Sequence, residues 1–104
     1  MANLAKALAR GAFATSNGTL YTVPNTTTTT VVTNIAIVNT TSTAGTFDIS
    51  LDGIKLFDAV AIAGDTTTII DLKQVLDANA TPKTITGFAS ATSINYHISG
   101  MEIS

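Results

Sequence analysis

The chain has 104 residues, which is the size of one ordinary domain. Hydrophobic residues make up 45% of it, charged residues 12%, and cysteine is absent, so we expect a folded core and exclude thiol catalysis, disulfides and Cys-based zinc sites. The formal net charge of −2 gives no electrostatic reason to expect binding to nucleic acids or to anionic membranes.

The N-terminal segment differs from the rest of the chain. We predict that residues 1–18 form an arm ahead of a β-domain over residues 19–104. Lys6 and Arg10 interrupt any apolar segment, so we expect no secretory signal. Because an isolated helix of this length is marginal in water, a frayed tail is the alternative to a short amphipathic helix. The apolar residues that fall on one helical stripe are Leu4, Ala5, Leu8, Ala9 and Ala12.

Short runs of strand-forming residues separated by turn residues follow, as in a sandwich or small barrel. Threonine, which favours strands, occurs twenty times, including the unbroken run Thr26–Thr30, which we interpret as an extended segment leading into the next strand. Thr30–Asn39 contains the apolar runs Val31-Val32 and Ile35–Val38 and is therefore predicted to be a central strand. Asp52-Gly53 predicts a tight hairpin turn. The predicted strands cover 19–23, 30–39, 47–51, 54–57, 66–72, 84–89 and 93–103.

The C-terminal part leaves one stretch open. Residues 73–81 fit either one helical turn or a loop, and Pro82 ends this stretch in both cases. We predict that the last two strands form a closing hairpin around Ser90–Thr92. A β-bulge at Ser99-Gly100 would bring Met101 and Ile103 to the same face as the preceding apolar residues. The predicted fold class is an all-β antiparallel sandwich, jelly-roll or Ig-like, of about seven to eight strands.

Side chains that could carry chemistry are few. The single histidine, His97, lies on the predicted polar face of the last strand, and one histidine supplies neither a catalytic triad nor a zinc site. Asp52 and Asp65 are predicted to be turn residues, and Asp48 and Asp71 exposed strand residues, because their spacing does not match a calcium-binding loop. No glycine-rich phosphate-binding motif occurs. We therefore expect no catalysis and no cofactor.

Three segments carry a family resemblance. They are Leu20–Pro24, Val31–Thr40 and Asn95–Ile103, and together with the strands between them they resemble a recurrent module of small virion structural proteins in tailed bacteriophages. The resemblance covers residues 19–104 and implies a β-sandwich of the head decoration (cement) type. Related β-domains also occur in tail, neck and fibre components. The resemblance implies no catalytic residue.

The functional prediction follows from this resemblance and from a Thr-rich surface of low charge, which suits repeated packing against neighbours. We expect a non-enzymatic virion protein, made in the host cytoplasm, that decorates the capsid and bridges major capsid subunits, as a homo-oligomer and most simply a trimer. The alternatives are a tail, neck or fibre module, or a β-sandwich that binds a host receptor or carbohydrate. The residues expected to contact the capsid are Leu4, Lys6, Leu8, Arg10 and Phe13.

Overall fold

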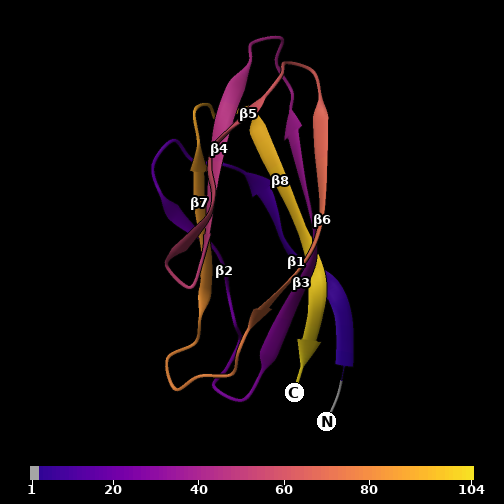
Figure 1. The fold of residues 1–104 in the computed structure, drawn as a ribbon, viewed down its shortest axis with the longest axis vertical. Helices are drawn as coiled ribbons and strands as arrows, with labels where there is room; N and C mark the ends of the chain where they lie inside the picture. The colour runs from indigo at the N-terminus through magenta and orange to yellow at the C-terminus, as the bar shows by residue number, and fades with distance from the viewer. Residues whose placement is uncertain (1–2) are drawn as a thin grey trace.

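The computed structural model describes residues 3–104, which form eight β-strands and no helix. The strands are β1 (Asn3–Ala12), β2 (Gly18–Thr22), β3 (Thr29–Asn39), β4 (Gly45–Leu51), β5 (Ile54–Ile62), β6 (Thr67–Leu76), β7 (Thr84–Ala89) and β8 (Ile94–Ile103). They form two antiparallel four-stranded sheets that face each other (Figure 1). The first sheet has the strand order β1-β8-β3-β6, and the second sheet has the order β2-β7-β4-β5.

The strand pairs are nested within one another. β1 pairs with β8, β2 with β7, β3 with β6 and β4 with β5, so the chain resembles one long hairpin wound into two sheets. This arrangement is a jelly roll. The tip of the hairpin is the predicted Asp52-Gly53 turn, where φ is 55° and 75°, the left-handed values that a two-residue turn of this type needs. The all-β sandwich is confirmed, and jelly roll is the form that it takes.

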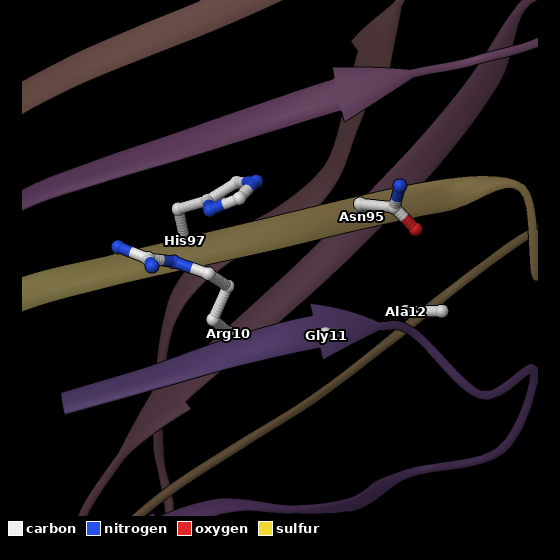
Figure 2. Close-up of a pocket in the computed structure, with 5 residues that line it drawn as sticks. All are labelled: Arg10, Gly11, Ala12, Asn95 and His97. Carbon is white, nitrogen blue, oxygen red and sulfur yellow. The ribbon is translucent and has the colours of Figure 1, made fainter. Parts of the chain in front are cut away.

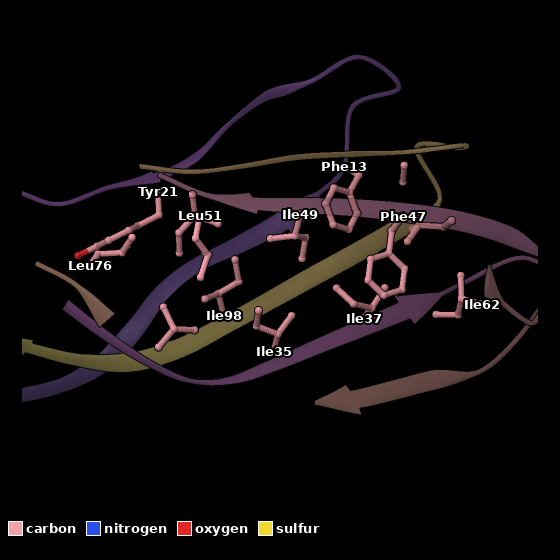
Figure 3. Packing of buried hydrophobic residues seen from close by; sticks show 14 of the residues in the cluster. Phe13, Tyr21, Ile35, Ile37, Phe47, Ile49, Leu51, Ile62, Leu76 and Ile98 are labelled. Atoms are coloured by element: carbon pink, nitrogen blue, oxygen red, sulfur yellow. The ribbon is translucent and has the colours of Figure 1, made fainter. Parts of the chain in front are cut away.

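The hydrophobic core lies between the two sheets (Figure 3). Alternate residues of each strand point into it, as the period of two requires. Phe13, which follows β1, stacks on Phe47 of β4 with ring centroids 6.4 Å apart, and it contacts Tyr96 of β8 at 4.9 Å. Ile35 and Ile37 of β3 are fully buried beneath these rings. Aromatic rings therefore join the N-terminal segment to both sheets.

β3 is an inner strand of the first sheet, as the apolar run Thr30–Asn39 predicted. The threonines ahead of it form a turn in which the Asn25 side-chain oxygen accepts hydrogen bonds from Thr27 and Thr28. β6 is longer than predicted and continues to Leu76, so residues 73–76 are neither a loop nor a helical turn. The extension occurs because Leu76 pairs with Thr30 and is 1% exposed, which adds an apolar side chain to the core.

Residues 3–12 of the predicted arm form neither a frayed tail nor a short helix. They form β1, an edge strand of the first sheet, and pair with β8 from Asn3 opposite Ile103 to Ala12 opposite Asn95. The register shifts once, between Ala7 and Ala9. Pairing wins over helix propensity because β8 would otherwise expose an unpaired edge, whereas a short helix would have no partner to pack against.

The closing hairpin is also wrong. β7 lies in the second sheet between β2 and β4, and β8 lies in the first sheet between β1 and β3. Each of the two strands is therefore paired on both of its edges, so β7 and β8 cannot pair with each other. The turn around Ser90–Thr92 instead carries the chain across from one sheet to the other, and Ser90 is held there by its backbone N–H, which donates to the Thr46 carbonyl oxygen at 2.9 Å.

The predicted bulge at Ser99-Gly100 is wrong as well. β8 keeps its alternation, and its neighbours change register instead, β1 around Leu8 and β3 around Thr33. Gly100 lies opposite the buried Val32, so even-numbered residues of β8 face inward throughout. Met101 consequently faces away from the core. The prediction failed because it assumed that the apolar side chains of Met101 and Ile103 must share the inward face of the preceding apolar residues.

Candidate functional site

The five predicted contact residues are separated by the fold. Phe13 is 1% exposed and belongs to the core, so it is not available to a partner in this structure. Leu8 is half-buried against the core. Leu4 is 56% exposed near the start of β1. Lys6 forms an ion pair, and Arg10 faces away from the core, so no single contact surface contains all five.

The outward face of the first sheet carries an apolar row that the sequence did not reveal. Cross-strand pairing places Ala5 opposite Met101, Met101 opposite Val31, and Val31 opposite Val75, so one residue from each strand contributes. We call these four residues the outer row. Val75 is 50% exposed. Ala5 is also exposed, and Val31 and Met101 are half-buried. Adjacent apolar side chains on a surface indicate an interaction more strongly than scattered ones do.

Nearby on the same face is an open hollow of about 310 Å³ between β1 and β8, which we call the Arg10 hollow. It is lined by Arg10, Gly11, Ala12, Asn95 and His97. Arg10 lies directly opposite His97, and Ala12 opposite Asn95. His97 is thus a half-buried, outward-facing strand residue, consistent with the predicted polar face.

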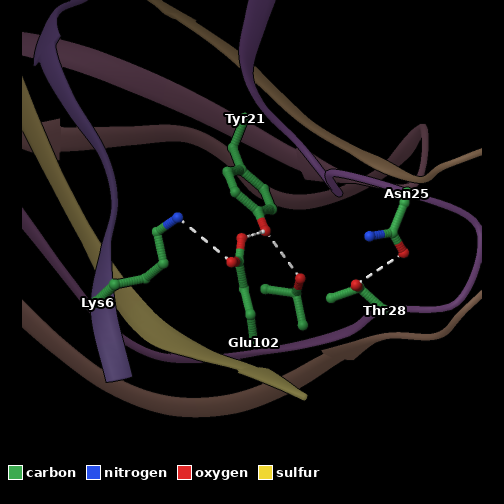
Figure 4. A network of polar contacts seen from close by, with 6 residues as sticks. Lys6, Tyr21, Asn25, Thr28 and Glu102 are labelled. Carbon is green, nitrogen blue, oxygen red and sulfur yellow. Dashed lines mark hydrogen bonds and ion pairs between the residues drawn. The ribbon is translucent and has the colours of Figure 1, made fainter. Parts of the chain in front are cut away.

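A polar network closes one end of the core (Figure 4). The Tyr21 hydroxyl of β2 donates to Glu102 of β8 at 2.5 Å and accepts from the Thr30 hydroxyl of β3 at 2.8 Å. Lys6 of β1 forms an ion pair with Glu102 at 3.3 Å. The network joins the second sheet to three strands of the first, and it explains how Glu102 can face inward. Burial, together with the hydrogen bond to Glu102, raises the pKa of Tyr21 to about 12, against the opposing effect of Thr30.

Tyr21→Phe is expected to lower the free energy of unfolding by about 1–3 kcal/mol at pH 7, because Thr30 and Glu102 lose a buried partner. A raised pKa of Tyr21 means that its contribution is complete below pH 10 and is lost as the pH rises toward 12. The difference between wild type and variant should therefore shrink across that interval in urea unfolding. Tyr96→Phe is the control, since its hydroxyl makes no side-chain hydrogen bond within residues 3–104. Equal losses in the two variants would contradict the network's role.

A second charged cluster lies on the outward face of the second sheet. Asp48 of β4 is 6% exposed, so the expectation of an exposed strand residue is wrong. Lys55 of β5 covers it, with Nζ 2.7 Å from Asp48 and 3.8 Å from Asp58, and lies 5.4 Å from the centre of the Phe88 ring. Burial raises the pKa of Asp48, but hydrogen bonds from Lys55 and from the Ala59 backbone outweigh burial and lower it.

Because the pKa of Asp48 is lowered in the folded state, we expect the protein to lose stability in acid. The stabilisation is present above the ordinary carboxyl pKa and is lost as the pH falls through the lower value in the folded state. We expect Asp48→Asn to be less stable than wild type at pH 7 and to lose less stability between pH 5 and pH 2. Urea unfolding across this range measures both effects. Asp77→Asn, which removes an exposed carboxylate, should follow the wild-type profile; an identical profile for Asp48→Asn would refute the assignment.

The described residues give no sign of metal chemistry or of a helical membrane anchor. Within residues 3–104, no three His, Cys, Asp or Glu side chains gather closely enough to hold a metal ion. The same residues contain no helix with the length and hydrophobicity to cross a bilayer. The features that remain as a candidate site are the outer row and the Arg10 hollow, both on the first sheet.

No protein-family model matches the chain, and no curated protein is similar to it. Solved structures do share its fold. A chain of the infectious bursal disease virus VP2 subviral particle matches with a TM-score of 0.54 and 9% identity over 97% of this chain. The Tobacco streak virus coat protein dimer matches with a TM-score of 0.52 and 12% identity over 99%. A chain in the capsid structure of Helicobacter pylori bacteriophage KHP30 matches with a TM-score of 0.53 and 8% identity over 99%.

The fraction of each matched chain that the alignment covers differs. This chain spans 32% of the infectious bursal disease virus chain, 83% of the Tobacco streak virus chain and 98% of the bacteriophage chain. The three structures are a viral subviral particle, a viral coat protein and a bacteriophage capsid. At these identities the likeness establishes the fold, the jelly roll found in viral capsid proteins.

Proposed function

We propose that this chain is a non-enzymatic structural protein of a virion, and specifically a decoration (cement) protein that stabilises the capsid by bridging major capsid subunits. The observation that carries the proposal is the jelly roll itself, which occupies nearly all of residues 3–104 and has the fold of viral capsid proteins. Short turns join most of the strands, so little of the described chain lies outside the sandwich.

The size of the domain is compatible with decoration of a capsid. The bacteriophage chain that matches is nearly the same length, because the alignment covers 99% of this chain and 98% of that one. A phage capsid can therefore hold a protein of this size and fold. Small bridging proteins act through many weak contacts that are replicated by symmetry, so none of the contacts has to be strong alone.

The surface that we propose for the contact is the outward face of the first sheet. The outer row supplies apolar area, and the Arg10 hollow, farther along β8 on the same face, supplies hydrogen-bond donors. This combination resembles the composition of protein interfaces, in which methionine and arginine are enriched. The proposal includes self-association, most simply as a trimer, so that one oligomer reaches several capsid subunits.

Quantitative mass spectrometry of purified source virions tests the proposal through the copy number of this chain relative to the major capsid protein. A ratio near parity supports decoration of the head. A small fixed fraction would instead assign the chain to the tail, neck or fibre. Absence from virions would overturn a virion role and favour a receptor- or carbohydrate-binding domain. Assembly of the purified chain alone into closed shells would identify a coat protein and contradict decoration.

A further inference from the structure

The only arginine and the only histidine of the chain lie directly opposite each other, Arg10 on β1 and His97 on β8. Figure 2 shows the guanidinium group beside the imidazole ring, with Asn95 farther along β8. Opposed residues of an antiparallel pair project from the same face, so both side chains border the Arg10 hollow. A guanidinium group and an imidazole ring are thus held side by side.

No intramolecular anion compensates this pair within the described part of the chain. The ion pairs there are made by Lys6, Lys55 and Lys83, and none involves Arg10. Asp71 faces the same side of the first sheet, but it lies on β6 at the opposite edge and accepts a hydrogen bond from Asn34 at 3.0 Å. Arg10 therefore presents a permanent positive charge at the hollow, and an external anion would complete an ion pair with it.

The donors around the hollow fit a carboxylate. A guanidinium group offers a planar fork of N–H donors that matches the two oxygens of a carboxylate, and His97 and Asn95 add an imidazole and a carboxamide donor. Exposed apolar residues elsewhere on the same face favour a protein as the source of that carboxylate. Ile69, at the other end of the strand row that contains Arg10 and His97, is 67% exposed, and the outer row lies on the same face.

We propose that the Arg10 hollow binds the carboxylate of an Asp or Glu side chain on a neighbouring virion protein, while the outer row packs against apolar residues around it. The occupant is argued from charge complementarity: a chain with a net charge of −2 presents its one arginine on this face, and none of the ion pairs within residues 3–104 involves it. The proposal rests on the proposed function for the identity of the partner, but not for the carboxylate chemistry.

The first test uses the isolated full chain and is independent of virions. In an amide-resolved NMR titration, sodium acetate should shift resonances of Gly11, Ala12 and Asn95 saturably, and acetamide should not. Arg10→Gln should weaken acetate binding at least about tenfold, the effect of losing a charge-assisted bidentate contact. Lys73→Gln, with the same charge change at an exposed residue of β6, should leave it unchanged. Unlocalised shifts, or tighter binding of inorganic phosphate than of acetate, would overturn the assignment.

The second test measures attachment of the purified chain to virions that lack it. Arg10→Gln should reduce the occupancy and Lys73→Gln should not. Equal occupancies would show that the hollow is not at the interface. If wild type itself fails to attach, the proposed function fails, while the acetate titration still decides the carboxylate site. Sedimentation without virions completes the test, because loss of self-association in Arg10→Gln would assign the carboxylate to another copy of this chain and overturn the partner assignment.

Discussion

Replacing Phe13 with alanine is expected to lower the free energy of unfolding by about 3–5 kcal/mol, the cost of removing a large buried aromatic side chain. Phe13 is 1% exposed and contacts both Phe47 and Tyr96, so its loss opens a cavity between the sheets. Its backbone N–H also donates to the Ile94 carbonyl oxygen at 2.9 Å, which fixes the chain as it leaves β1. A domain of this size has only about 5–15 kcal/mol of stability in total, so the variant should be close to unfolding.

Leu4→Ala is the matched control from the same segment. Leu4 is 56% exposed, and its replacement should change stability by no more than about 0.5 kcal/mol. Urea unfolding followed by circular dichroism measures both variants. If Phe13→Ala were as stable as Leu4→Ala, the N-terminal segment would not be packed against the core, and residues 1–18 would be an independent arm after all.

Gly100→Val is expected to lower the free energy of unfolding by about 1–3 kcal/mol or more, through overpacking. A β-carbon at this residue would overlap the carbonyl oxygen of Val31 in the neighbouring strand and would come within 2.9 Å of Leu8 Cδ1. The backbone of β3 cannot move away without breaking its pairing with β8. The glycine is therefore required by the close approach of the two strands where both neighbours of β8 change register.

Gly18→Val provides the control, because a β-carbon at Gly18 of β2 has no neighbour within 4 Å. Valine favours strands, so this variant should be neutral or slightly stabilised. Thermal unfolding of the two variants and of wild type separates the effects. In a domain of this size, each kcal/mol of lost stability lowers the unfolding midpoint by about 4–8 °C. A neutral Gly100→Val would mean that β8 does not have the register described here.

Local sequence signals predicted most of the second sheet and the centre of the first. The apolar run Thr30–Asn39 marked β3, and residues 84–89 coincide with β7. Asp52-Gly53 marked the tip of the nested hairpins, because its left-handed backbone angles suit few other residue pairs. These elements were predictable because each depends on residues that are close together in the chain.

The first strand and the last strand were misread for a different reason. Leu4 and Leu8 have helical spacing, and no local residue indicates that their segment pairs with β8, about ninety residues away. In β8 the sequence suggested that Met101 faces the core, whereas the inward residue is Glu102, which Tyr21 and Lys6 satisfy. Long-range pairing decided both outcomes, and a single sequence does not contain it.

The candidate site was predictable only in part. Arg10 was identified as a contact residue, and His97 as a residue of a polar face. Their meeting in one hollow depends on the register between β1 and β8. The outer row depends on three such registers at once, so residues from four strands form one surface without any shared signal in the sequence.

The nested pairing of the strands has a consequence for how the chain reaches its fold. Among the nested strand pairs, only β4 and β5 are consecutive in the chain and joined by a short turn. Each outer pair encloses all the pairs inside it and so closes a longer loop. Each inner pair, once formed, shortens the loop that the next pair has to close and so reduces its entropic cost. We therefore expect a slow folding reaction that is limited by distant contacts, with the Asp52-Gly53 turn as its earliest structure and the β1–β8 pairing as its last step.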